Sequence, residues 1–510
     1  MLPSSKHFKA RQVFTFITGM VECLFFAGII FGWASLVFLL KSRGFFGSFC
    51  VNTTNSDGAR VQDCRGQDEQ FSLVFTIASF MNNFLTFLNG VIFDRFGTLV
   101  ARLFGLALHT SGILMLTFAT PALSMMLYPA LSFIAVGGMM LLLSNMQVAN
   151  LFGAHRSTII TIYNGAFDSS SGVFVLVKLA YESGIPLKAS FLFLAAGSIY
   201  HILRTIFLFP RTSIPYPPPD HYKYGISCRR LRKSNKTVQS DFQMPVEEKP
   251  HDVKEPERPE KTFRECVLSK FFFFVVLWLS VIQLRHYLFI GTLNPMLERL
   301  AHGDTSVVSQ YINAFAFTQM CGLLVAPLNG FILDRHKRKP PVAGMSEREA
   351  DLNSAVLSFF LTSLVSLIFS ICASIPVLPL QYFTFIALMV NYSFVYGGMA
   401  AFVAMTFPPC HFGKLYGFIF GLSAVFSSLQ YACFAVVEEL LDGDPLYMNI
   451  GLTILILFSF SHPLNVFLHC RALASQRAKA NKITDMTTKL QLLKSPCDGL
   501  NMETYFIVLD

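Results

Sequence analysis

Charged residues are scarce in this sequence, and it lacks the motifs that enzymes use to hold phosphates, metals or nucleophiles. Only 14% of its 510 residues are charged, whereas 53% are hydrophobic. A soluble core of ordinary shape cannot bury so much apolar surface, but a lipid bilayer can accept it. There is no glycine-rich phosphate loop, nucleophile elbow or cluster of metal ligands. The sequence therefore argues against an enzyme and predicts an all-α membrane protein without a cofactor or a bound metal.

Long apolar runs are abundant, and their number predicts a multi-pass protein. A helix needs about 20 apolar residues to span a bilayer. Twelve runs of sufficient length occur, six in each half of the chain, near residues 13–40, 71–93, 99–119, 123–146, 157–181, 186–209, 269–294, 308–332, 353–375, 378–406, 412–436 and 446–468. We therefore expect two six-helix bundles.

The basic residues indicate the orientation of the chain in the membrane. The net charge is +9, but the lysines and arginines gather before residue 13, between 210 and 266, and after 332. Segments of this kind stay on the cytosolic side, so the charge reports topology and not a nucleic-acid partner. Both termini are expected in the cytosol.

The loop at 41–70 falls on the opposite side and has the features of an extracellular segment. It contains Cys50 and Cys64 and the glycosylation sequon that begins at Asn52. An oxidising, glycosylating compartment favours a Cys50–Cys64 disulfide and a glycan on Asn52. The alternative leaves both thiols free. The other cysteines have no metal-like spacing and are interpreted as packing residues.

The composition divides the chain into four parts. Residues 1–209 form the predicted N-terminal bundle, and residues 267–469 form the C-terminal bundle. The connector at 210–266 is rich in proline and charge and poor in large apolar residues, so we expect it to be disordered and cytosolic. Residues 470–510 form a cytosolic tail, with a short amphipathic helix near 490–493.

A seven-residue motif occurs twice, 240 residues apart. Residues 89–95 (NGVIFDR) and 329–335 (NGFILDR) are identical at five of seven positions, each after a long apolar run. Such duplication is typical of transporters. The aspartates could accept hydrogen bonds from a neighbouring helix N-terminus or pair with an arginine, and the glycines allow close helix packing. We therefore predict a gating role for Gly90, Asp94, Arg95, Gly330, Asp334 and Arg335; the alternative is a solvated turn.

Polar residues near mid-membrane are costly and are default candidates for a substrate site. Two carboxylates, Glu22 and Asp168, lie at similar depth if helices rise by about 1.5 Å per residue. The full set of candidates is Glu22, Asn82, Asp168, Gln283, His286 and Asn391. The alternative for the amides, and equally for Glu22, is hydrogen bonding between helices. Arg285 is interpreted as an anchor or a counter-ion of a carboxylate, and Lys178 as an interfacial anchor.

The spans, the repeated motif and the long central loop resemble the major facilitator superfamily. Within it the chain is most similar to solute carrier family 43. That resemblance rests on longer strings at Phe80–Phe84, His155–Ile160, Asn164–Ser171, His286–Asn294 and Asn313–Gln319.

The resemblance implies facilitated, sodium-independent transport of a small molecule across the plasma membrane by a monomer. The purine-carrying branch of the family matches better than the branch for neutral amino acids, so purine nucleobases such as adenine, guanine and hypoxanthine are the expected substrates. Two alternatives remain: a uniporter of large neutral amino acids, and a membrane glycoprotein that does not transport. Proton coupling through Glu22 or Asp168 also remains open, because a buried carboxyl readily holds a proton.

Overall fold

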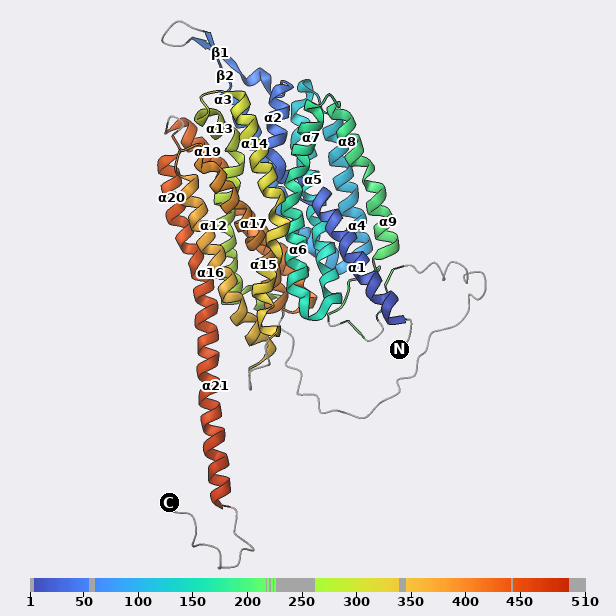
Figure 1. Ribbon diagram of the computed structural model, residues 1–510, viewed down its shortest axis with the longest axis vertical. Helices are drawn as coiled ribbons and strands as arrows, with labels where there is room; N and C mark the ends of the chain where they lie inside the picture. The colour runs from blue at the N-terminus through green and yellow to red at the C-terminus, as the bar shows by residue number, and fades with distance from the viewer. Residues whose placement is uncertain are drawn as a thin grey trace, which may run out of the picture.

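The structure is a computed structural model, and it is almost entirely helical. It describes residues 4–54, 60–216, 218–219, 222, 224–225, 262–338, 345–441 and 444–494. The helices run along one common direction (Figure 1), as expected for spans of a bilayer. α1 begins and α21 ends at the same end of the molecule, called here the termini end, and the hairpin β1–β2 lies at the opposite, hairpin end.

The N-terminal half forms a bundle whose first span is interrupted. α1 gives way to a π-helical turn at Cys23–Ala27 and a 3-10 turn at Ile29–Gly32 before α2 resumes. Polar groups freed by such breaks are tolerated only inside protein. The 3-10 turn is buried throughout, whereas the π-helical turn buries Cys23 and Ala27 and exposes Phe25. The helices are α1 (Ser4–Glu22), α2 (Trp33–Ser42), α3 (Arg65–Phe84), α4 (Thr86–Phe118), α5 (Leu127–Met146), α6 (Arg156–Ser169), α7 (Val173–Glu182), α8 (Leu187–Ala196) and α9 (Ser198–Leu208).

The C-terminal half repeats this arrangement. It contains α11 (Phe263–Val267), α12 (Lys270–Gly291), α13 (Leu293–Leu300), α14 (Thr305–Met320), α15 (Gly322–Leu333), α16 (Glu347–Ala373), α17 (Leu380–Thr406), α18 (Phe412–Ser427), α19 (Leu429–Glu439), α20 (Leu446–Ile456) and α21 (Ser461–Lys494). α11 begins with a capping box, in which Thr262 and Glu265 satisfy each other's backbone N–H groups.

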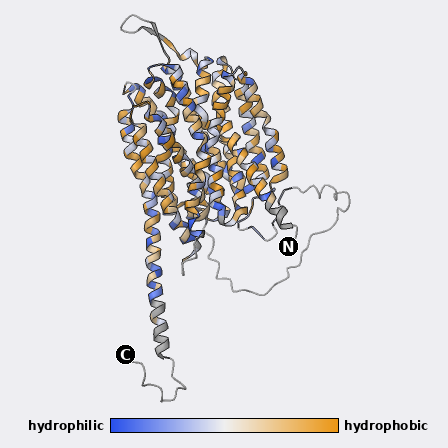
Figure 2. Cartoon of the chain, in the orientation of Figure 1, coloured by the Kyte–Doolittle hydropathy of each residue, from blue (hydrophilic) through white to orange (hydrophobic). Residues whose placement is uncertain are grey.

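Ten helical stretches in the described part are long and apolar enough to cross a membrane by length and composition. One of them, Arg65–Phe118, is 54 residues long and reverses at Gly97, where φ is 78°, so it supplies two crossings. The helices α6 and α7 add a further crossing that is rich in serine, threonine and asparagine and is buried between its neighbours. Apolar residues dominate the helical body, whereas the projecting part of α21 is more polar (Figure 2).

The two bundles meet through equivalent helices. α6 packs on α15 and α17 of the other half, and α18 packs on α3 and α4. Because α6 and α18 belong to the fifth and eleventh predicted spans, these contacts are related by the internal repeat. They place both copies of the seven-residue motif at the interface.

The connector between the bundles and the C-terminal tail differ in part from the structure predicted for them. Described residues of the predicted connector pack on the N-terminal bundle: Ile214 accepts a hydrogen bond from Asn150 (2.8 Å), and Tyr216 lies over the guanidinium of Arg156. These contacts hold the connector's first residues, which the composition did not reveal; 226–261 lie outside the described residues. The tail also differs, since α21 continues from the last span to Lys494 without a break at residue 470.

The hairpin-end loop contains the predicted Cys50–Cys64 disulfide. It also contains two short antiparallel strands that the all-α prediction did not include, β1 (Val51–Thr54) and β2 (Arg60–Asp63). The backbone of Asn52 lies in β1, but its side chain is outside the described part, so its glycosylation stays a prediction.

Candidate functional site: a closed chamber between two bundles

At the termini end, Asp94 of one bundle holds the start of α18 of the other. The backbone N–H of Lys414, in the first turn of α18, donates to Oδ2 of Asp94 (3.0 Å). The first N–H groups of a helix have no partner within the helix and carry partial positive charge, so a carboxylate there is stabilising. The backbones are in direct contact at this point, because a Cβ on Gly90 would overlap the carbonyl oxygen of Gly413.

Asp334 makes the equivalent contact with α6 in the repeated motif. Its Oδ2 accepts from the backbone N–H of Thr158 (2.9 Å) and from the hydroxyl of Thr158 (2.7 Å). A Cβ on Gly330 would lie 2.5 Å from the Cα of Thr158, so this approach also needs a glycine. Asp334 is buried, and Lys337 lies 3.3 Å from its other oxygen. The Asp94 and Asp334 contacts are called the two latches below.

The arginines of the repeated motif do not take part in these contacts. Arg95 is exposed and its guanidinium lies over the ring of Phe96. Arg335 donates to the carbonyl of Asn353 (3.4 Å), within its own bundle. Their predicted gating role stays untested, and the structure places neither across the interface.

At the hairpin end, other polar contacts join the bundles. Lys178 is fully buried and its Nζ donates to Ser309 Oγ (2.6 Å) and Asn313 Oδ1 (2.8 Å) on α14. The prediction of Lys178 as an interfacial anchor is therefore wrong, because the side chain points into the bundle interface. Lys41 likewise bridges Asp68 of its own bundle and Glu298 of the other.

Between the two ends lie two small cavities that share Phe31 as a wall. Each has a volume of about 10 Å³, and together they are called the central chamber. Both are lined by residues of both bundles. The first is lined by Phe31, Asp168, Ser171, Ile290, Phe315, Gln319 and Tyr392, and the second by Phe31, Asn82, Asn83, Met139, Leu142, Asn164, Phe167, Tyr287, Tyr396, Tyr416 and Phe420.

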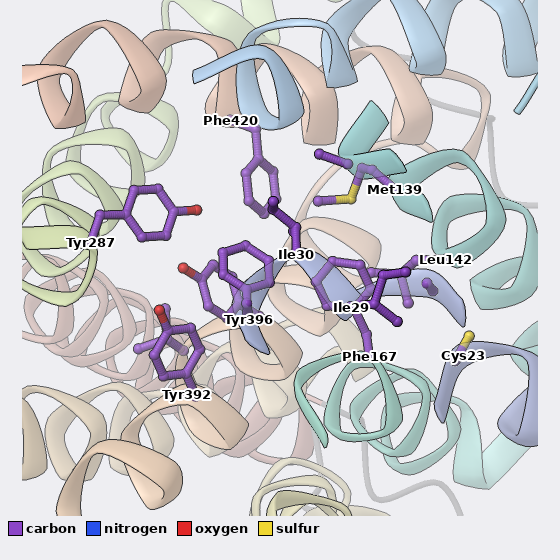
Figure 3. Packing of buried hydrophobic residues seen from close by; sticks show 14 of the residues in the cluster. Cys23, Ile29, Ile30, Met139, Leu142, Phe167, Tyr287, Tyr392, Tyr396 and Phe420 are labelled. Carbon is purple, nitrogen blue, oxygen red and sulfur yellow. The ribbon is translucent and has the colours of Figure 1, made fainter. Parts of the chain in front are cut away.

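Aromatic rings form much of the chamber wall. Phe31 is stacked with Tyr287 at a centroid distance of 5.9 Å, and Tyr396 is stacked with Phe420 at 6.1 Å. Figure 3 shows the rings of the C-terminal bundle facing Phe167 and neighbouring apolar residues of the N-terminal bundle. A chamber built in this way offers flat apolar faces to a small planar molecule.

Asp168 is the single carboxylate in this lining, and the described part of the chain gives neither of its oxygens a hydrogen-bond partner. Oδ1 of Asn82, Oδ1 of Asn164 and the hydroxyls of Ser171 and Tyr416 are also buried without a partner among the described residues. Buried polar groups are nearly always hydrogen-bonded, and an unsatisfied one costs about 1 to 3 kcal/mol. So many unpaired groups around one space indicate a site that a polar ligand completes.

The other predicted binding residues divide into two groups. Asn82 lines the chamber, and Gln283 stands behind it, where its Nε2 donates to the Tyr287 hydroxyl (3.4 Å). His286 stacks on the chamber residue Tyr392 with centroids 4.5 Å apart. Asn391 instead donates to Ser366 and to the Thr362 carbonyl (2.6 and 3.0 Å), so it ties α17 to α16.

Glu22 lies apart from the chamber, in a buried ion cluster within the N-terminal bundle. Its Oε1 pairs with Arg102 and His201, and its Oε2 pairs with Arg204 and accepts from Asn145 (2.7 Å). The carboxylate is fully buried and both oxygens are taken. In the structure Glu22 thus pairs with two buried arginines and joins four helices.

Replacing Glu22 with glutamine is therefore expected to destabilise the fold. Removing one partner of a buried pair costs about 3 to 5 kcal/mol, because the remaining charge is left uncompensated. We expect a lower thermal unfolding temperature and less protein at the cell surface, with unchanged KM in the transport that remains. Glu439→Gln is the matched control, since that carboxylate is exposed. Normal stability with a raised KM would instead return Glu22 to substrate binding.

Most of the aromatic residues that line the chamber were not predicted from the sequence. Tyr287, Tyr396 and Tyr416 were not selected, although tyrosine in a span is usual near the membrane surface and these lie well inside. Their position deep within the spans was the signal that could have identified these tyrosines as chamber residues. Phe31 could not be distinguished among 54 phenylalanines. Among the described residues, no three His, Cys, Asp or Glu side chains gather as metal ligands would.

Two pseudo-symmetric helical bundles, closed against each other at both ends around a small central chamber, define the class of membrane transporters that move a solute between bundles. The Major Facilitator Superfamily model matches residues 23–430. The chain belongs to that superfamily and, within it, to solute carrier family 43.

Individual relatives agree with this assignment. Equilibrative nucleobase transporter 1 of Bos taurus is 47% identical over 485 residues, which cover 92% of this chain and 98% of the relative. Large neutral amino acids transporter small subunit 3 of Homo sapiens is 28% identical, with 94% and 97% covered. The crystal structure of the human organic anion transporter MFSD10 has the same fold, with a TM-score of 0.57 at 15% identity and coverage of 91% of this chain and 100% of that one.

Proposed function

We propose that this protein is a facilitative, sodium-independent transporter of purine nucleobases in the plasma membrane. The observation that carries the proposal is the chamber: flat aromatic walls surround unpaired carboxylate, amide and hydroxyl groups. The similarity to the bovine protein named for nucleobase transport supports the same substrate class.

The chemistry of a purine matches the chamber groups. A purine is planar and neutral, with N–H donors and ring-nitrogen acceptors on its edge. Its faces would lie against rings such as Phe31 and Tyr396, while Asp168 and the amide oxygens of Asn82 and Asn164 accept from its N–H groups. The hydroxyl of Tyr416 would donate to a ring nitrogen.

The closed ends support an alternating-access mechanism. The two latches seal the termini end, and Lys178 and Lys41 join the bundles at the hairpin end. In this state both sides are closed, and the chamber must widen when the cargo enters. Opening either set of contacts alone would expose the chamber to one side. The distribution of basic residues supports a cytosolic location for the termini end.

The neutral amino-acid alternative is less well supported by the chamber. An amino-acid zwitterion needs a positive group or a helix N-terminus for its carboxylate, and the residues that line the described chamber include no lysine, arginine or histidine. The third hypothesis, a non-transporting membrane glycoprotein, leaves the unpaired chamber groups without a purpose.

Uptake measurements decide between these functions. Cells expressing the chain are given labelled adenine or labelled leucine, with and without sodium and with and without an outward proton gradient. Saturable, sodium-independent adenine uptake is expected. Saturable leucine uptake without adenine uptake would show that the substrate is a neutral amino acid. If the protein reaches the cell surface and takes up neither compound, the proposed transport function is contradicted.

The hairpin-end contacts give a separate prediction. Lys178→Met is expected to open that end, because each hydrogen bond from a charged group is worth about 1.5 to 3 kcal/mol. A cysteine placed at the chamber residue Gln319 should then react several-fold faster with an impermeant thiol reagent added from outside. The same variant without the added cysteine corrects for background labelling, and Lys188→Met tests loss of an unrelated lysine. An unchanged rate would contradict a role of Lys178 in closure.

A further inference from the structure

A larger cavity lies inside the C-terminal bundle at the hairpin end, away from the central chamber. It has a volume of about 280 Å³ and is bounded by the ends of α12, α16, α17, α19 and α20, with α13 over it. None of its lining residues belongs to the chamber or to the N-terminal bundle. Transport of a substrate through the central chamber does not involve this cavity.

Arg285 lines this cavity and carries a charge that no carboxylate of the described residues neutralises. The residue is 2% exposed and lies roughly 9 Å from the end of α12, at about 1.5 Å per residue. Its Nε and Nη2 donate to the hydroxyl and carbonyl of Ser370 (3.0 and 3.3 Å). No carboxylate pairs with it in the described part of the chain, so neither role predicted for Arg285, surface anchor or counter-ion, agrees with the structure.

The other charged groups around the cavity are already engaged. Arg299 pairs with Glu438 (3.4 Å), and Asp444 accepts the backbone N–H of Leu446 (3.0 Å). Within the described ranges, Arg285 is thus the buried charge at this cavity that lacks a counter-ion. Burying a lone charge is costly, and the cost is offset when an ion of opposite sign is bound beside it.

The wall beside Arg285 is apolar. Leu288 and Phe434 belong to a hydrophobic cluster that includes Met448, and all three line the cavity. A ligand that pairs with Arg285 and also packs against this apolar wall has a single anionic head and a compact apolar body. We propose that this cavity is a second binding site, distinct from the substrate chamber, for a small amphipathic anion whose head pairs with Arg285.

Binding of a defined probe tests the proposal on the full chain in nanodiscs of zwitterionic phosphatidylcholine. Radiolabelled 4-butylbenzenesulfonate is measured by equilibrium dialysis against empty discs, and 4-butylbenzyl alcohol and 4-butylbenzylammonium are matched neutral and cationic competitors. We expect one saturable site per chain that neither competitor displaces. Arg285→Gln should raise Kd more than tenfold, whereas Arg285→Lys should retain binding. Met448→Trp should abolish it by filling the cavity.

Two further arms identify the source of the anion and separate this site from the chamber. If phosphatidylglycerol in the discs lowers probe binding to the wild type, a lipid headgroup occupies the same site; if it does not, the ligand is a free anion. Asp168→Asn and excess adenine should leave Kd unchanged, so this result is independent of the substrate assignment. Absence of saturable binding, equal binding by Arg285→Gln, or equal displacement by all three head groups would overturn the proposal.

Discussion

Asp168→Asn is expected to lower adenine uptake by about 10- to 100-fold while the protein still reaches the cell surface. The carboxylate is the chamber's single acidic group, and neither oxygen has a partner among the described residues. A hydrogen bond to a charged group is worth about 1.5 to 3 kcal/mol, and each 1.4 kcal/mol is a factor of ten. Because no hydrogen bond within the described part of the chain depends on this carboxylate, its loss should affect the substrate more than the fold.

The measurement separates these effects. Initial rates of labelled adenine uptake give KM and Vmax, and surface biotinylation gives the amount of transporter. The expected change is a higher KM at equal surface level. Glu439→Gln makes the same chemical change at an exposed site outside the chamber and should behave as wild type. Equal uptake by Asp168→Asn would remove Asp168 from the substrate site, whereas loss from the surface would indicate a structural role.

The sequence predicted the architecture well because lipid imposes a simple pattern on it. Apolar runs revealed the spans, and the repeated motif revealed the two halves. The spans that failed simple expectation are those with a function in the interior. The first span breaks at Cys23–Gly32, and the fifth breaks between α6 and α7 at Ser170–Gly172, and both spans line the chamber.

The site was only partly predictable, because depth along a helix does not say which way a side chain points. Glu22 and Asp168 were equivalent by depth, but Glu22 faces Arg102 and Arg204 inside one bundle and Asp168 faces the other bundle. Lys178 was misjudged for the same reason. Whether a buried charged residue forms an ion pair or lies unpaired in a chamber can be decided only from how the helices pack.

Loss of the latches is expected to slow turnover with little effect on apparent affinity. Asp334→Ala should lower Vmax more than tenfold, with KM within about twofold, since a capping contact is worth about 0.5 to 2 kcal/mol and the charge at a helix N-terminus about 0.3 to 1 kcal/mol more. Asp334→Asn keeps an acceptor oxygen and loses only the charge, so its effect should be smaller. Asp94→Ala should also lower Vmax, because Asp94 accepts backbone hydrogen bonds at the start of α18 as Asp334 does at the start of α6.

The glycines test the same closure by a different route. Gly90→Ala adds a Cβ that would overlap the carbonyl of Gly413, so the bundles could not come together even though Asp94 is intact. Its Vmax should fall at least as far as that of Asp94→Ala. Asp304→Asn is the control, because Asp304 caps α14 within its own bundle and asparagine caps a helix equally well. If the latch variants raise KM and leave Vmax unchanged, the repeated motif acts in recognition, and the two bundles do not depend on these contacts to close.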